Sequence, residues 1–248
     1  MSKPGSETAP RRLFGGWPFA VAALVIVATG VAVGVSHTHE VWMRRRLLAT
    51  PMDEVAHHPD LVAYASAKAK PIFAHNCAGC HGADMKGLAA AGAPNLTDTT
   101  TLYGNDVFHI ERTILYGIRS GQKRANDITE MPAFGQRGQL SDADIKDVVQ
   151  YILKLNGRPY DDGDALAGQV VYAGKGVCFD CHAPDAKGEA DYGAPDLTAN
   201  VWDYGGDPKS LYNSIYYGRH GVMPTWIGKL SLAQIRALAV YIYASSHK

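Results

Sequence analysis

The chain has 248 residues, a formal net charge of zero, 46% hydrophobic residues and 19% charged residues. This length allows one large domain or two small ones. Because there is no basic excess, the composition excludes a protein that binds nucleic acid by general neutralisation of phosphates.

An uncharged apolar segment near the N-terminus predicts a transmembrane helix. No Asp, Glu, Lys or Arg occurs in residues 13–35, and about 20 apolar residues suffice to cross the hydrocarbon core of a bilayer. The alternative is a cleaved signal peptide, whose apolar core is shorter, about 7–15 residues. We therefore expect an anchor over residues 13–35, preceded by a cytoplasmic segment, residues 1–12, and followed by a tether, residues 36–59.

The rest of the chain contains one unit in two copies. The motif NCAGCHGADMKG at 76–87 returns as VCFDCHAPDAKG at 177–188, an offset of 101 residues that also relates GAPNLT to GAPDLT. The two Met-Pro pairs are only 92 residues apart, so the first copy has nine extra residues, within SGQKRANDITE. A register held over so many points predicts tandem domains of one fold, residues 60–156 and 165–248, with a linker at 157–164.

Each copy ends with a sequence typical of an amphipathic helix. Ser141 is a suitable N-cap, and the residues that follow at i, i+3, i+4 and i+7 spacing are Ile145, Val148, Val149 and Ile152. Ser231 precedes the corresponding set Leu232, Ile235, Leu238, Ala239 and Ile242. No long run alternates polar and apolar residues, so an all-α fold is predicted. Domains of this size have small apolar cores, to which a large apolar cofactor would add buried surface.

The cysteines favour covalent haem attachment. Disulfides between cysteines three apart would not explain the histidine after each pair, a thioredoxin-like motif belongs beside a βαβ pattern, and zinc would need four ligands from separate repeats. C-x-x-C-H is instead typical of c-type haem, with two thioethers to the porphyrin and the histidine as proximal iron ligand. We therefore expect two haems, one on Cys77, Cys80 and His81 and the other on Cys178, Cys181 and His182.

Met131 and Met223 are the candidate sixth ligands of the two irons. Coordination by His and Met closes the iron and raises its reduction potential, which suits electron transfer. Each methionine precedes a proline, which disfavours helix at the preceding residue, and each lies upstream of the final helix of its copy. His109, the rival ligand in the first domain, has Ser210 as its counterpart. The sequence leaves open whether each methionine binds the haem of its own domain or of the other.

These motifs together resemble those of a known family. The order NCAGCHGADMKG, GAPNLTD, LYG, EMPAFG, then CFDCH, GAPDLT, DYGG and SIYYGRHGVMPTW is similar to the membrane-anchored dihaem CcoP or FixP subunit of cbb3-type cytochrome c oxidases, over residues 60–246. The resemblance implies an all-α chain with two tandem cytochrome c domains behind a single N-terminal transmembrane helix. It also implies the axial pairs His81 with Met131 and His182 with Met223.

The resemblance implies an electron-transfer subunit rather than an enzyme. Electrons from a cytochrome c or a quinol-oxidising complex would pass through both haems to the catalytic haem–copper subunit, with a monohaem cytochrome subunit as a further partner. Since covalent haem attachment takes place outside the bacterial cytoplasmic membrane, both haem domains would be periplasmic. A free-standing dihaem carrier for a periplasmic dehydrogenase would use the same haems, whereas a dihaem enzyme would need an open iron or a ligand other than methionine.

Overall fold

The computed structural model describes residues 17–126 and 129–248. The chain divides into two units, residues 1–46 and residues 47–248. Over the described residues the regular structure is helical, with isolated β-bridges and no strands, which confirms the predicted all-α class. The expected cytoplasmic segment, residues 1–12, and the first four residues of the expected anchor, residues 13–16, lie outside the described residues.

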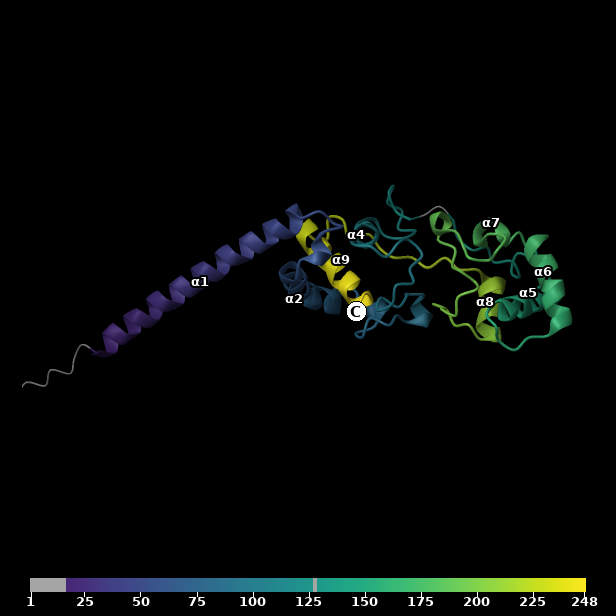
Figure 1. Cartoon of the computed structure of the whole chain (residues 1–248), viewed down its shortest axis with the longest axis horizontal. Helices are drawn as coiled ribbons and strands as arrows, with labels where there is room; N and C mark the ends of the chain where they lie inside the picture. Colours follow the sequence, from purple (N-terminus) through teal and green to yellow (C-terminus); the bar gives the residue numbers. More distant parts are fainter. Residues whose placement is uncertain (1–16, 127–128) are drawn as a thin grey trace, which may run out of the picture. The chain divides into compact units, whose positions relative to one another are not determined.

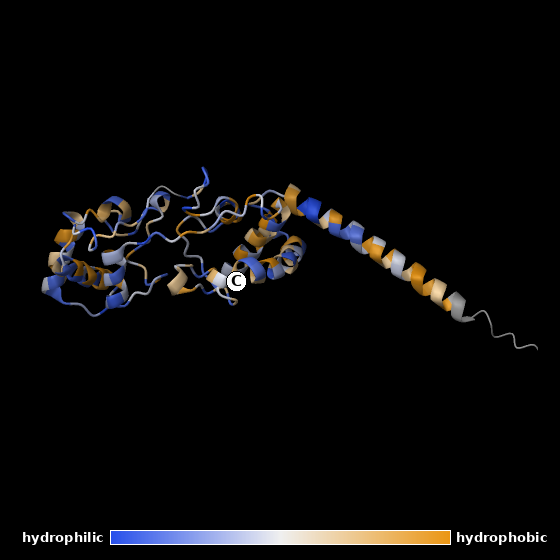
Figure 2. Cartoon of the chain, turned by 180° about the vertical axis from the view of Figure 1, so that it is seen from behind, coloured by the Kyte–Doolittle hydropathy of each residue, from blue (hydrophilic) through white to orange (hydrophobic). Residues whose placement is uncertain are grey.

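Helix α1, Trp17–Ala49, supplies the described part of the first unit, and its last three residues belong to the second unit. The part Val21–Ala49 contains an 18-residue stretch with a mean hydropathy of 1.9 and is long and apolar enough to cross a membrane. Its apolar residues gather in the N-terminal half (Figure 2), where Leu24 and Ile26 are each 71% exposed. The helix continues through much of the expected tether because no Gly or Pro interrupts it before Pro51.

The second unit contains corresponding elements from the two copies. The first copy supplies η1 Val55–His57, α2 Pro59–Asn76, α3 Ala78–His81, η2 Ala89–Ala91, α4 Val107–Tyr116 and α5 Asp142–Leu155. The second copy supplies α6 Asp162–Ala173, α7 Phe179–His182, η3 Ala190–Tyr192, α8 Pro208–Tyr217 and α9 Leu232–Ser246. Apart from η1, the elements follow the same order in both copies, which is the structural counterpart of the sequence repeat.

The two copies exchange their final helices. Helix α9, from the second copy, packs against α2 and α4 of the first copy, and α5, from the first copy, packs against α6 and α8 of the second (Figure 1). Two helical bodies result. The first body consists of α2, α3, α4 and α9, and the second body consists of α5, α6, α7 and α8. Each body therefore contains residues from both copies, a feature that the order of motifs did not indicate.

Both exchanged helices begin with the predicted N-caps. Ser141 Oγ accepts a hydrogen bond from Asp144 N at 3.2 Å, and Asp144 in turn accepts one from Ser141 N at 2.9 Å. Ser231 and Gln234 form the equivalent capping box at 3.4 and 2.8 Å. Such a cap stabilises a helix by about 1 kcal/mol. The caps fix where each helix begins, and the apolar face that follows is buried in the opposite copy.

Helix α6 packs closely against α5. It begins with Asp161 as N-cap, accepting from Asp164 N at 3.0 Å, so the last residues of the expected linker are helical. Further along, Gly168 lies so close to α5 that a Cβ at this position would overlap the Asp147 backbone. Burial of α5 side chains such as Ile145, which is 0% exposed, contributes about 1.5–3 kcal/mol each.

Candidate functional site

Each CxxCH motif forms a short helical turn. Cys77 directly follows α2 and leads into α3, and Cys178 leads into α7. In both turns the histidine N–H donates to the carbonyl of the first cysteine at 2.9 Å. No disulfide joins the four cysteines, and burial raises the pKa of the Cys77 and Cys178 thiols to about 11. Buried thiols of this kind are poor redox nucleophiles, which disfavours the thioredoxin-like interpretation.

Both motif histidines are oriented by a proline carbonyl. His81 Nδ1 lies 3.4 Å from Pro94 O, and His182 Nδ1 lies 3.0 Å from Pro195 O. When Nδ1–H donates to the carbonyl, Nε2 is free to bind a metal. Burial also lowers the pKa of both histidines and so favours the neutral imidazole that coordination needs. The repeated Gly-Ala-Pro sequence therefore supplies the acceptor for the histidine, a role that its position in the sequence did not indicate.

The two Met-Pro loops cross between the copies. Met223 exchanges two backbone hydrogen bonds of 3.0 Å with Ile118, just after α4 of the first copy. Met131 exchanges hydrogen bonds of 3.0 and 3.1 Å with Arg219, just after α8 of the second copy. Met131 also packs against the apolar cluster of the second body, as does Cys178.

The axial pairs that the family resemblance implied stay a prediction, but the loops that carry the two methionines cross between the copies. Met131 pairs with Arg219 of the second copy, Met223 pairs with Ile118 of the first copy, and both methionines line one cavity together with His81 and His182. The physical reason is the helix exchange. Each methionine loop leads into a final helix that packs in the opposite body, so the loop crosses with its helix.

Both motifs and both methionines line one cavity of about 570 Å³, which we call the shared cavity. Much of its wall is apolar and comes from both copies, including Ile114, Ile118, Phe134, Leu211 and Ile215. Trp202 also lines it, and the buried Trp202 Nε1 has no hydrogen-bond partner among the described residues. Buried donors are rarely left unpaired, and a haem propionate is an acceptor that suits this position. The donor set and the apolar wall thus fit haem.

His109, considered above as a rival ligand, does not line the shared cavity. Its Nδ1 lies 2.6 Å from the carboxylate of Asp106, the N-cap residue of α4. The His109 side chain is 43% exposed. The side chain is thus engaged at the start of α4.

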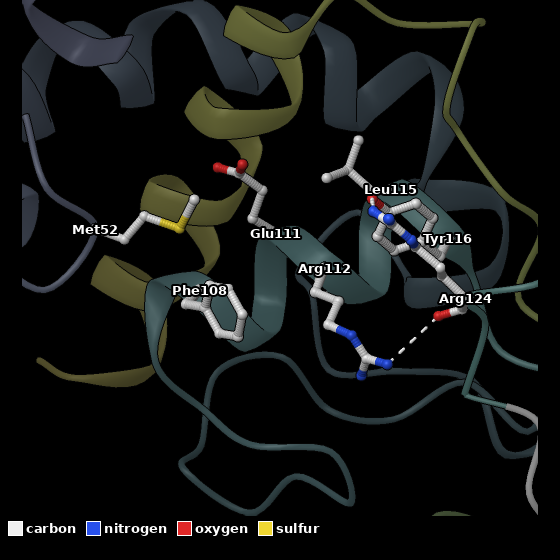
Figure 3. Close-up of a pocket in the computed structure, with 7 residues that line it drawn as sticks. All are labelled: Met52, Phe108, Glu111, Arg112, Leu115, Tyr116 and Arg124. Atoms are coloured by element: carbon white, nitrogen blue, oxygen red, sulfur yellow. Dashed lines mark hydrogen bonds between the residues drawn. The ribbon is translucent and has the colours of Figure 1, made fainter. Parts of the chain in front are cut away.

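A second, smaller cavity lies beside α4 and has a volume of about 440 Å³ (Figure 3). Its polar side chains have partners within the chain. Arg112 donates to Asn126 Oδ1 at 2.7 Å and to Arg124 O at 3.5 Å, and Arg124 donates to Tyr116 Oη at 3.1 Å. No residue of either CxxCH motif lines this cavity. We therefore treat it as a packing feature of the first body and not as part of the site.

Paired CxxCH turns with oriented histidines on a shared cavity are the features of a c-type cytochrome with two haems. Comparisons with known proteins agree with this class. The family model "Cytochrome c" matches residues 66–156, and the model "Cytochrome C oxidase, cbb3-type, subunit III" matches residues 163–242.

Similar proteins narrow the class to one family. The chain is 41% identical over 199 residues to the cbb3-type cytochrome c oxidase subunit FixP of Bradyrhizobium sp., covering 80% of this chain and 67% of that protein. It is 37% identical over 201 residues to subunit CcoP of Cereibacter sphaeroides, covering 81% and 68%. It is 40% identical over 207 residues to subunit CcoP of Rhodobacter capsulatus, covering 80% and 68%. The chain belongs to the CcoP/FixP family of cbb3-type oxidase subunits, and the predicted two covalently bound haem c groups are confirmed.

Proposed function

We propose that this chain is a membrane-anchored electron-relay subunit of a cbb3-type oxidase. It takes electrons from a periplasmic cytochrome c or a quinol-oxidising complex and passes them to the catalytic haem–copper subunit. The shared cavity carries this proposal, because both CxxCH motifs and both methionine loops face it within one folded unit. The haem irons supply reversible one-electron chemistry, and the chain positions and tunes them.

The proposed ligand sets are crossed between the copies. Cys77, Cys80 and His81 hold the first haem with Met223, and Cys178, Cys181 and His182 hold the second with Met131. The backbone pairing of Met223 with Ile118 and of Met131 with Arg219 supports this assignment. With methionine on each iron, neither has an open position for a substrate, which favours relay over enzymatic turnover.

A test of the ligand sets requires that the two haems be distinguished by their absorption spectra, and we call the haem with the altered spectrum the marked haem. Replacing Cys178 with Ala leaves the second haem with a single thioether and shifts its α-band, so the two haems are distinguished during a redox titration. In this background, Met131→His should lower the potential of the marked haem, and Met223→His should lower that of the unmarked haem, because histidine in place of methionine lowers the potential. If Met131→His instead lowers the potential of the unmarked haem and Met223→His that of the marked haem, each methionine binds the haem of its own copy.

The proposed orientation places the N-terminus in the cytoplasm and both haem domains in the periplasm. It is supported by α1, which is suited to span a membrane, and by covalent haem attachment outside the cytoplasmic membrane. Protease added to intact spheroplasts should remove the haem domains and spare an N-terminal tag. Retention of the haem domains with loss of the tag would reverse the orientation.

The proposed partners are the catalytic haem–copper subunit and a monohaem cytochrome subunit. Purification of the tagged chain in mild detergent should retain the haem–copper subunit, and the preparation should consume oxygen with reduced cytochrome c. A stable dihaem chain without that subunit, still reducible by a periplasmic dehydrogenase, would instead support the free-standing carrier.

A further inference from the structure

Two tyrosines at equivalent positions each reach across to the other copy. Tyr204, from the second copy, lies against Gly92 of the first, where a Cβ would overlap the tyrosine hydroxyl oxygen. Tyr103, from the first copy, has the same relationship to Gly193 of the second. The two glycines have φ values of +60° and +63°, a region that favours glycine. The contacts are therefore reciprocal and have the same geometry on both sides.

Each of these glycines opens a loop that orients a motif histidine. Gly92 is two residues before Pro94, whose carbonyl oxygen lies 3.4 Å from His81 Nδ1. Gly193 has the same position relative to Pro195, the acceptor for His182. A tyrosine from one copy thus packs against the loop that holds the histidine of the other copy.

Tyr204 also contacts the methionine loop of the same site. A Cβ on Gly221, two residues before Met223, would lie only 2.8 Å from Tyr204 Oη. Gly221 is itself tied to the first copy, because Arg119 Nε donates to its carbonyl at 2.7 Å. The hydroxyl end of Tyr204 therefore lies where the histidine loop and the methionine loop of the first site meet.

The ring of Tyr204 contacts Arg219 of the second copy. The guanidinium carbon of Arg219 lies 4.0 Å from the centre of this ring, and the Arg219 backbone pairs with Met131. Tyr103 has no such cation, because the counterpart of Arg219 in the first copy is Ile118, which pairs with Met223. Of the two tyrosines, Tyr204 is the one that contacts ligand-bearing segments of both sites.

We propose that Tyr103 and Tyr204 are positioning residues that each fix the ligand loops of the haem site in the opposite copy, and that Tyr204 links the two sites through Arg219. The inference rests on the crossed ligand sets proposed above. Residues that hold ligand loops set the orientation of the ligands and so tune the metal. We therefore expect these tyrosines to influence the potential of the haem whose motif lies in the other copy.

The first test is a redox titration of the haem-loaded full chain in the Cys178→Ala background. Tyr204→Leu should shift the potential of the unmarked haem, bound at Cys77 and Cys80, and through Arg219 also that of the marked haem, whereas Tyr103→Leu should shift the potential of the marked haem alone. The control is Tyr217→Leu, since Tyr217 is 50% exposed on α8. Shifts confined to the haem of the tyrosine's own copy, or no larger than in the control, would overturn the proposal.

The second test is a double-mutant cycle read by thermal unfolding of the haem-loaded chain. Gly92→Ala should lower the melting temperature less in a Tyr204→Ala background, because the overlap with the tyrosine is then removed. Gly138→Ala is the matched control, since Gly138 has φ +66° and no atom within 4 Å of a built Cβ. Its effect should be the same with or without Tyr204.

The two tests separate this inference from the ligand assignment. An equal effect of Gly92→Ala in both backgrounds would overturn the tyrosine contact, whichever methionine binds which haem. A positive cycle together with own-copy methionine ligation would instead leave the contact intact and refute the crossed ligand sets.

Discussion

Arg236 on α9 forms a buried ion pair with Glu111 on α4 and so joins helices from the two copies. Their side chains are 7% and 3% exposed, and the Glu111 carboxylate is directed toward α9 (Figure 3). Arg236 Nη1 also donates to Leu47 O at 3.3 Å and Thr50 O at 3.4 Å. These carbonyls lie at the end of α1, where no intrahelical donor remains. One guanidinium therefore holds together the exchanged helix, α4 and the beginning of the second unit.

Replacing Arg236 with Met is expected to lower the free energy of unfolding by about 3–5 kcal/mol, because the Glu111 carboxylate would stay buried without its partner. Chemical denaturation of the haem-loaded chain measures this loss. Arg137→Met is the control, since its ion pair with Glu130 spans 3.7 Å between exposed side chains and should contribute about 0–1 kcal/mol. The double variant with Glu111→Met should recover much of the loss, and a double variant as unstable as Arg236→Met would contradict the explanation.

Asp144 on α5 is expected to make the docking of the exchanged helix sensitive to acid. Lys175 Nζ, in the second copy, lies 2.6 Å from Asp144 Oδ1, and Ser141 Oγ donates to Oδ2 at 2.7 Å. These contacts, of which the one with Lys175 has the largest effect, lower the pKa of Asp144 to about 2. A carboxylate whose pKa is lower in the folded state stabilises the fold above the unfolded value of about 4. This stabilisation is lost as the pH falls from about 4 to about 2.

Asp144→Asn should therefore lower the melting temperature at pH 7 and have little effect near pH 2, where the native carboxyl is itself becoming neutral. The free energy of unfolding at pH 7 is expected to fall by about 0.5–1 kcal/mol, which is typical of a partly exposed ion pair. Thermal unfolding across this pH range measures it, with Asp191→Asn, an exposed carboxylate, as the comparison. A difference between wild type and Asp144→Asn that does not change with pH would refute the assignment.

The unpaired indole of Trp202 leads to a prediction about the second haem. A donor that binds an ionised propionate weakens the negative field of that carboxylate at the iron. Trp202→Phe should therefore lower the potential of the haem at Cys178 and Cys181, because Trp202 packs against the same cluster as Cys178.

A redox titration with one haem marked measures this change. Trp226→Phe is the matched control, since Trp226 also lines the shared cavity but its ring faces Lys229 at 5.5 Å. An unaltered potential in Trp202→Phe with both haems retained would show that the indole has another partner.

Local sequence was sufficient to predict the elements that depend on neighbouring residues. The N-caps Ser141 and Ser231 and the apolar faces behind them involve residues within a few helical turns. The apolar segment before Val35 predicted a helix suited to a membrane by composition alone. The continuation of α1 to Ala49 could also have been predicted, because no Gly or Pro occurs between Val35 and Pro51.

The sequence by itself determined that this is an all-α chain with two haem-binding copies behind an apolar helix. Only the tertiary structure decided which copy each final helix and methionine loop joins. The physical reason is that α5 and α9 have equivalent apolar faces, and two copies of one fold offer them equivalent grooves, so periodicity cannot distinguish the partners. The choice depends on contacts between distant residues, namely the buried pair of Arg236 with Glu111 and the close approach of α5 at Gly168.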